Sequence, residues 1–286
     1  MGKKWKRVLR IAAGILSAAY LFPVVFTCLQ SFVSPEEISA LYSNVDSGVY
    51  KSLRCALLPR QFSFRQYYEV LLNNSAYLMS FWNSAALSIL ITALNTMLSV
   101  ALGYMLATAR FFGRKAAVRF VAVTMLLPWQ AMMLPNYLLS KWLGIYDSWA
   151  ALIIVQGFSS FGVFLMYQFM RSVPDELIDA ASLDTNSSFV ILLRIACPIA
   201  KPGIIACMAL AFAESWNMVE QPLTLIEDTL KYPLSMLINT MSIEHVDIAF
   251  ACAVVYMFPV ISLSVFFGQK LMDGVAILHT GGTQDG

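Results

Sequence analysis

The chain has 286 residues, a mean hydropathy of +0.68 and charged side chains at only 13% of its positions. Soluble domains usually carry about 25% charged residues, so this composition excludes an ordinary water-soluble core. The charges lie in short blocks between long apolar runs, which is typical of an all-α, polytopic membrane protein. A net charge of +2 without a dense Lys/Arg run gives no indication of nucleic-acid binding.

Six stretches are long enough to cross a bilayer as helices, which takes about 20 mostly apolar residues. They cover residues 9–32, 81–109, 118–139, 148–170, 203–225 and 249–271. Helix is the expected form, because a span in lipid must satisfy its backbone groups internally. Pro128 and Pro135 predict a bend or a local break in the third span.

The first apolar run follows a basic flank, "MGKKWKRVLR", and a cleaved signal peptide is the competing interpretation. We favour an uncleaved first span, because the run extends to about Phe32 without a clear cleavage site. The Lys/Arg bias then places both termini in the cytoplasm. Of the 19 basic residues, those left outside are Lys51, Arg54, Arg60, Arg65, Lys141 and Lys231.

The chain carries no recognisable catalytic or metal-binding motif. The segment "FFGRKAA" lacks the spacing of a nucleotide-binding P-loop, and no H-E-x-x-H pattern occurs. His245 and His279 stand alone, and the five cysteines form no C-x-x-C pair. We therefore expect no enzymatic activity, and no metal or cofactor bound by this chain.

A polar segment, "PDELIDAASLDTNSS" (174–188), separates the fourth and fifth spans and is cytoplasmic in the predicted orientation. Ser172 or Val173 suits the N-cap, the proline suits the first helical position, and two carboxylates follow at the positive end of the helix dipole. The helix should end at "DTNSS", and "FVILLRIACPIA" is expected to form a second amphipathic helix that stops by Pro198. Together they predict a helix–turn–helix hairpin over 172–201.

One face of the first hairpin helix carries Leu177, Ala180, Ala181 and Asp184, spaced at i, i+3, i+4 and i+7. Small side chains on that face let another surface approach the backbone closely. An ordinary interfacial connector is the alternative, but such a connector does not need a small-faced acidic helix. We therefore interpret the hairpin as a docking element for a soluble partner.

The hairpin resembles the EAA loop of ABC-transporter permease subunits, the inner-membrane components of binding-protein-dependent importers. The residues in register with the carbohydrate, maltose-permease-like branch are Pro174, Glu176, Leu177, Asp179, Ala180, Ala181, Asp184, Ile195, Pro198 and Pro202. Thr185-Asn186 replaces a family Gly-Ala, and that glycine permits a positive φ, which is costly for threonine. We expect the turn to shift by one residue, with Asn186 in the left-handed conformation.

Further segments resemble the same branch, in the same order along the chain. They are "FSFRQYYEVL", "RFFGR", "LLPWQAMMLPNYLLSKWLGIYDSWAALI", "ESWNMVEQPL" and "FFGQKLMDGV". The resemblance implies a single transmembrane permease domain over 1–286, with a first span and long extracellular loop in 1–80, a core region in 81–276 and a cytoplasmic tail in 277–286. The tail after Gly274 departs from the family pattern.

The resemblance also implies the role of a permease subunit in an ATP-driven importer for a sugar or oligosaccharide, in the bacterial inner membrane. Its partners would be a second permease subunit, two ATPase subunits that bind ATP and Mg, and an extracellular solute-binding protein. Contact with the ATPase would fall on Glu176, Asp179, Ala180, Ala181, Leu183, Asp184, Thr185, Asn186 and Phe189.

Sugars are bound through hydrogen bonds and apolar stacking on aromatic rings. Side chains of these kinds at membrane depth are Gln130, Tyr137, Trp216 and Asn217. Packing is the alternative role for Trp216, and an interhelical hydrogen bond is the alternative for Asn217. A permease for another solute, such as glycerol phosphate, is one alternative function. An ion-coupled secondary transporter is another, for which only Glu214 and Glu220 offer carboxylates near the middle of the membrane.

Overall fold

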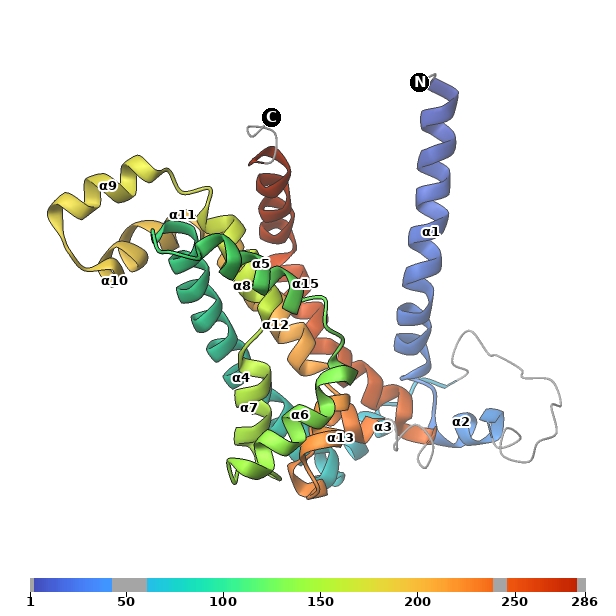
Figure 1. Ribbon diagram of the computed structural model, residues 1–286. Coiled ribbons are helices and arrows are strands. Elements are labelled where there is room, and N and C mark those ends of the chain that lie inside the picture. The colour runs from blue at the N-terminus through green and yellow to red at the C-terminus, as the bar shows by residue number, and fades with distance from the viewer. Residues whose placement is uncertain (1–2, 43–60, 239–245, 282–286) are drawn as a thin grey trace. The chain divides into compact units, whose positions relative to one another are not determined.

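The computed structural model describes residues 3–42, 61–238 and 246–281 (Figure 1). Within these ranges the chain consists of helices, loops and one isolated antiparallel bridge between Val33 and Phe62. The prediction of an all-α protein is confirmed.

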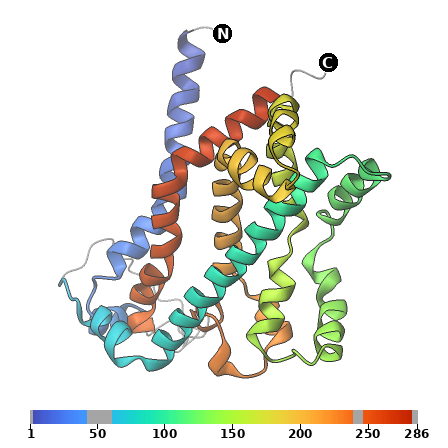
Figure 2. The same ribbon diagram turned by 90° about the vertical axis from the view of Figure 1, so that its left-hand side faces the viewer.

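Among the described helices α1, α4 and α15 are long and apolar, and the others are shorter. In order they are α1 (Lys3–Gln30), α2 (Pro35–Tyr42), α3 (Arg65–Tyr68), the π-helical turn η1 (Glu69–Asn73), α4 (Ser75–Thr108), α5 (Arg114–Thr124), α6 (Trp129–Trp142), α7 (Trp149–Gly157), α8 (Ser160–Met170), α9 (Asp175–Asp184), α10 (Ser188–Ile191), the π-helical turn η2 (Leu192–Ala196), α11 (Cys197–Ile199), α12 (Lys201–Trp216), α13 (Glu220–Leu225), the 3-10 turn η3 (Thr229–Lys231) and α15 (Val246–Gly281). Figure 2 shows the same elements from a second side.

Two compact units make up the chain. One unit combines Met1–Met79 with Leu237–Pro259, and the other combines Ser80–Met236 with Val260–Gly286. Helices α4 and α15 each contribute to both units. In the first unit, the hydroxyl of Tyr77 donates a 2.8 Å hydrogen bond to the Cys252 carbonyl, which joins the start of α4 to α15.

Four described helical segments are long and apolar enough to cross a membrane singly, and two bent pairs raise the number to six if each pair is one span. The single segments are Arg7–Gln30, Ser75–Thr108, Trp149–Met170 and Ile248–Gly268. The bent pairs are Arg114–Thr124 with Trp129–Trp142, at 103°, and Ser188–Ile199 with Lys201–Trp216, at 86°. These segments overlap the six predicted stretches.

The third predicted span is broken, as its prolines indicated. Helix α5 ends at Thr124, and Pro128 takes an extended conformation (φ −69°, ψ 144°) as the N-cap of α6. Pro135 lies inside α6 and does not end it. Pro128 is therefore the residue that separates the two halves, because it precedes the new helix where no amide donor is needed.

The fifth predicted span, 203–225, does not form one helix. Helix α12 ends at Trp216, and the short α13 begins at Glu220. Pro222 lies in the first turn of α13, where its missing amide hydrogen costs nothing, whereas it could not have continued α12. The break sets α13 apart as a separate short element after α12.

Helices α4, α8 and α12 pack closely in the second unit because glycines stand where they meet. A Cβ added to Gly162 of α8 would lie 2.5 Å from the Ser99 hydroxyl oxygen of α4, and one added to Gly203 of α12 would lie 2.2 Å from Cγ of Phe169 on α8. Small residues let membrane helices approach at the backbone. Since α8 leads into the hairpin and α12 leads out of it, this packing fixes the root of the hairpin.

Helix α15 continues through the start of the predicted cytoplasmic tail to Gly281. The rest of that tail lies outside the described residues, and so do His245 and residues 43–60 of the predicted extracellular loop.

Candidate functional site

The predicted hairpin is present between α8 and α12. Its first leg is α9, and its second leg runs through α10, η2 and α11 (Figure 1). Pro174 is the N-cap, with φ −60° and ψ 133°, so α9 begins one residue later than the sequence suggested. The second leg passes Pro198 and ends at Ile199, with Ala200 as its C-cap. The π-helical turn before this proline replaces the regular bonding pattern that a proline would interrupt.

The turn between the legs differs from the expected one. Thr185 is extended (φ −151°, ψ 136°), and its hydroxyl accepts a 3.2 Å hydrogen bond from the Ser187 amide. Among the described non-glycine residues only Asp147 has a positive φ, so the prediction that Asn186 would be left-handed is wrong. Because neither Thr185 nor Asn186 has a positive φ, the turn requires no glycine at either position.

Apolar contacts hold the two legs of the hairpin together. Ala181 is buried in one apolar cluster with Ile191 and Leu192 of the second leg, and Ile178 packs against this cluster. The same apolar cluster includes Phe169 of α8, which is the residue in contact with α12. The hairpin is therefore packed onto the helices from which it projects, and its position follows theirs.

An open groove of about 600 Å³ lies between the legs. Its lining comprises Leu177, Ala180, Ala181, Asp184, Thr185, Val190, Ile191, Arg194 and Ile195. The four residues predicted to share one face of the first helix all line this groove. Beside it, Leu183 is 88% exposed and Phe189 is also exposed, so two large apolar side chains project from the tip of the hairpin without cover from this chain.

A second cavity, of about 660 Å³, lies at the root of the hairpin and brings basic and acidic residues together. Its charged lining residues are Arg110, Arg114, Arg171, Asp175, Glu176 and Asp179. The predicted contact residues Glu176 and Asp179 thus face the root as well as solvent, whereas Asp184 lines the groove.

Arg114 binds carbonyl groups at the C-terminal end of α4, beside this cavity. Its guanidinium donates to the carbonyl of Leu106 at 2.6 Å and also to the carbonyl of Ala107. A cation is favourable at the C-terminal end of a helix, where carbonyl groups lack amide partners. Gly113, at φ 90°, allows the chain to reverse direction so that the arginine reaches back.

The four predicted substrate residues make different contacts. Gln130 on α6 donates a 2.7 Å hydrogen bond to Glu220 of α13. Trp216 is 1% exposed and packs against Phe212, so its ring forms part of the packed core in this conformation. Asn217 is exposed, and its amide donates a 2.7 Å bond to the Ala213 carbonyl of α12.

Tyr137 packs against an aromatic residue of the loop between α6 and α7. Its ring packs edge-on against Tyr146, with centroids 5.2 Å apart. The ammonium group of Lys141 lies 4.0 Å from the Tyr146 ring centroid, which is within cation–π range. Gln130 and Tyr137 are two helical turns apart on α6, so they lie on the same side of that helix.

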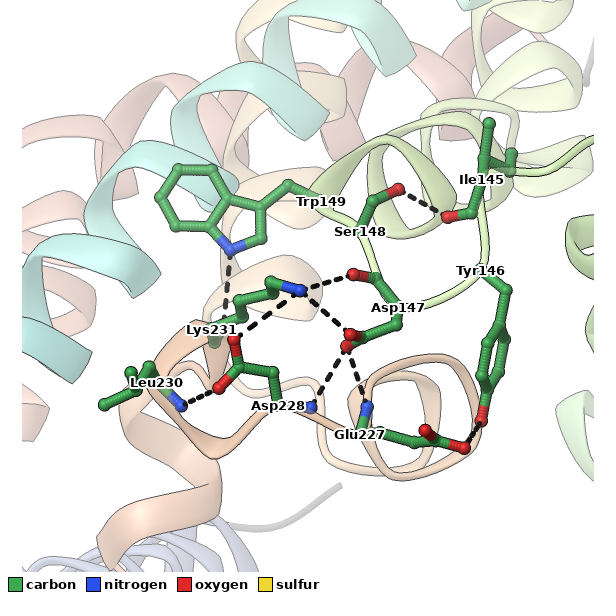
Figure 3. Close-up of polar contacts among 9 residues, drawn as sticks. All are labelled: Ile145, Tyr146, Asp147, Ser148, Trp149, Glu227, Asp228, Leu230 and Lys231. Atoms are coloured by element: carbon green, nitrogen blue, oxygen red, sulfur yellow. Dashed lines mark hydrogen bonds and ion pairs between the residues drawn. The ribbon is translucent and has the colours of Figure 1, made fainter.

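A charged cluster that the sequence did not indicate joins the α6–α7 loop to the segment after α13 (Figure 3). We call it the Asp147 clasp, and it consists of Asp147, Glu227, Asp228 and Lys231. One carboxylate oxygen of Asp147 accepts 3.0 Å hydrogen bonds from the amides of Glu227 and Asp228. Lys231 donates to the other carboxylate oxygen at 2.9 Å and to the Asp147 carbonyl at 2.7 Å.

Electrostatics favour the charged form of the clasp. The amide of Asp228, followed by the ammonium of Lys231, lowers the pKa of Asp147 to about 2. The same contact raises the pKa of Lys231. Because Asp147 and Lys231 are 84 positions apart, no local sequence pattern could have identified the pair.

Around the clasp, two further contacts tie the same two segments together. The indole of Trp149 donates a 3.2 Å bond to the Lys231 carbonyl, and the Tyr146 hydroxyl donates a 3.0 Å bond to a Glu227 carboxylate (Figure 3).

Among the residues the structure describes, no group of three His, Cys, Asp or Glu side chains could hold a metal ion.

Several apolar helices of membrane-spanning length, with a hairpin between α8 and α12, are the features of a multi-pass membrane protein. Residues 99–274 match the family described as "Binding-protein-dependent transport system inner membrane component", and the chain belongs to this family. It is accordingly a multi-pass protein of the inner membrane and a transporter permease, not a nucleotide-binding enzyme. The match runs from the second half of α4, through the hairpin, into α15.

Relatives of known role cover most of the chain. It is 30% identical to the arabinooligosaccharides transport system permease protein AraQ of Bacillus subtilis (strain 168), over 92% of this chain and 91% of that one. It is 26% identical to the polygalacturonan/rhamnogalacturonan transport system permease protein YtcP of the same organism, over 79% and 76% of the two chains. A chain in the crystal structure of a bacterial ABC transporter for the acidic polysaccharide alginate shares its fold, with a TM-score of 0.79, 21% identity and coverage of 94% and 98%.

Proposed function

We propose that this chain is a permease subunit of an ATP-driven importer for a sugar or oligosaccharide, and that the hairpin at 172–201 docks onto a separate ATPase. The open groove between the hairpin legs, with the uncovered Leu183 and Phe189 beside it, is the observation that carries the docking proposal. The relatives named above, which transport oligosaccharides and polysaccharides, support the solute class. Both termini are proposed to be cytoplasmic, on the Lys/Arg bias.

In this proposal the hairpin transmits motion from the ATPase to the spans. ATP and Mg would be bound by the ATPase subunits, and closure of their dimer would move the docked hairpin as a rigid body. Since the hairpin packs on Phe169, and Phe169 packs on Gly203, the motion would pass directly to α8 and α12. Such a coupling element biases a bundle between two arrangements.

The docking surface is proposed to comprise the predicted contact residues, each in a distinct role. Ala180 and Ala181 leave room in the groove, and Leu183 and Phe189 supply apolar contact. The carboxylates of Glu176, Asp179 and Asp184 flank that surface, and the turn at Thr185 and Asn186 spaces the two legs.

A second permease subunit and an extracellular solute-binding protein would complete the importer. On the side of the pathway formed by this chain, Gln130 and Tyr137 are the strongest candidates for contact with the solute, because they share one side of α6. Asn217, which is exposed, is a third candidate. Because Trp216 is buried, it would pack behind the residues that line the solute pathway and would not stack on a sugar.

Two substitutions that introduce the same charged side chain at different positions of α9 test the docking proposal. Ala180→Glu puts a charged side chain into the groove, whereas Ser182→Glu puts the same side chain on an exposed position of α9 outside it. In proteoliposomes holding the complete importer, ATP-driven uptake should fall at least about fivefold for Ala180→Glu, the lower end of coupling between two sites. Uptake should stay near the unsubstituted level for Ser182→Glu. Equal uptake by both variants would refute docking through the groove.

A further inference from the structure

The segment that precedes α4 carries three distinct faces. Gln66 and Val70, four residues apart, are both fully buried. Arg65, Glu69 and Asn73 repeat at the same spacing and form a polar face. The remaining exposed face is apolar and consists of Phe64, Tyr68, Leu71 and Leu72, with Phe62 just before it.

The apolar face is large and uncovered within its unit. Phe64 is 71% exposed, Tyr68 is 56% exposed and Leu72 is 67% exposed. Large apolar side chains gathered on one exposed face mark an interaction surface, whereas single ones need no explanation.

This face is held in place at the end of α1. Phe62 pairs with Val33 in the antiparallel bridge, and the Ser63 amide donates a 2.9 Å bond to the Phe32 carbonyl. A 2.7 Å hydrogen bond also joins the hydroxyls of Tyr67 and Ser31. The segment is therefore anchored where the membrane-spanning part of α1, Arg7–Gln30, ends, and it runs directly into the spanning helix α4.

The polar face makes its own contacts away from the apolar one. Arg65 donates to Glu36 at 3.0 Å, and Asn73 donates to Glu69 at 2.9 Å. Arg65, Glu69 and Asn73 line a cavity of about 380 Å³ in the same unit. Charge and apolar surface are thus separated on one short segment, as in helices that lie in the plane of a membrane interface.

We propose that residues 62–73 lie in the membrane interface, with Phe62, Phe64, Tyr68, Leu71 and Leu72 among the lipid headgroups and upper acyl chains. The proposal rests on the membrane location of the chain and not on its orientation or on docking of the hairpin. The segment is anchored at the end of α1, and the membrane-spanning part of that helix also exposes large apolar side chains, among them Phe22 and Val25. Tyrosine is enriched at the membrane interface, and phenylalanine is common on the apolar face of interfacial helices.

Depth-dependent quenching tests this proposal in the full chain, reconstituted in phosphatidylcholine vesicles together with its transporter partners. In a background without native cysteines, an environment-sensitive fluorophore is attached at Phe64→Cys, at Tyr68→Cys and, as a polar-face control, at Asn73→Cys. Lipid carrying a spin label near the headgroup should quench positions 64 and 68 at least about threefold more than position 73, because collisional quenching needs the label and the fluorophore at one depth. Soluble iodide should show the reverse order.

A further position on the same face is included because Phe64→Cys removes a packing contact. Phe64 packs on Phe32 with ring centroids 5.5 Å apart. Leu72→Cys reports on the same face without that contact, and it should behave like position 68. Equal quenching by lipid at positions 68, 72 and 73 would overturn the proposal. So would lipid quenching that appears only after the partner subunits are removed, since a protein would then be the occupant of the face.

Discussion

Lys231 lies 2.9 Å from a carboxylate oxygen of Asp147 and 2.7 Å from the carbonyl oxygen of the same residue. A single ammonium group therefore fixes both the side chain and the backbone of residue 147. That backbone is left-handed, with φ 56°, a conformation that aspartate and asparagine tolerate better than other non-glycine residues. The contact joins two loops that are far apart in the sequence.

Substitutions of Asp147 should separate the effect of its charge from the effect of its left-handed backbone. Asp147→Asn removes the charge and keeps a side chain that tolerates the left-handed region, whereas Asp147→Val also strains the backbone. Thermal unfolding of the solubilised chain should occur at a lower temperature for Asp147→Asn than for the unsubstituted chain, and at a still lower temperature for Asp147→Val. If the two variants unfold at the same temperature, the left-handed backbone contributes nothing to the choice of residue.

The clasp should also depend on pH in a defined direction. The pKa of Asp147 is lowered from 3.8 to about 2, so its stabilising effect is fully present above the unfolded-state pKa and disappears as the pH falls from about 4 to about 2. The difference in unfolding temperature between the unsubstituted chain and Asp147→Asn should therefore be constant from pH 5 to pH 8, and it should shrink below pH 4. A difference that changes between pH 6 and pH 8 would point to another titrating group.

Close packing at the hairpin root predicts strong sensitivity at Gly203. A methyl group there would lie within 2.2 Å of the Phe169 ring, so Gly203→Ala should destabilise the chain by about 1–3 kcal/mol, the usual range for overpacking. Gly14→Ala is the matched control, because nothing lies within 4 Å of the added methyl on α1. Unfolding in denaturant should show a loss for Gly203→Ala only, and an equal loss in both variants would argue against contact between α8 and α12.

Arg114 should hold the last turn of α4 closed. Arg114→Gln removes the charge that faces the α4 carbonyls, and Lys115→Gln removes an exposed neighbouring charge as the control. Amide hydrogen exchange over residues 105–113 should become faster in Arg114→Gln by about threefold to fivefold, which corresponds to the roughly 0.5–1 kcal/mol of a cation at a helix end. If exchange rises equally in Lys115→Gln, general charge loss and not capping would be responsible.

Features set by local pattern were predictable from the sequence. The apolar runs identified the membrane segments, and the spacing of Leu177, Ala180 and Asp184 identified a shared face. Pro128 and Pro135 predicted a bend or break in the third span, although the sequence did not say which of the two would be its site. Each of these depends on residues within a few turns of one another, so the chain itself carries the signal.

Features set by tertiary contact were not predictable. The Asn186 prediction failed because it considered only which residue tolerates a positive φ, whereas the turn is made with Thr185 extended and its hydroxyl bonded to the Ser187 amide. The Asp147 clasp was missed because its partners meet only after α6, α7 and α13 have folded. Candidates at membrane depth, such as Trp216, could be chosen by chemical type, but which way the ring points is decided by its neighbours.

The central claim is that the tip of the hairpin touches an ATPase subunit. A photoreactive amino acid introduced at Leu183 or Phe189, both exposed, measures this contact directly in the assembled importer. Trp142, which is also exposed and ends α6, provides the control position. Our account predicts that illumination links the ATPase to positions 183 and 189 and not to position 142. Absence of an ATPase product from both hairpin positions, or equal yield from position 142, would contradict it.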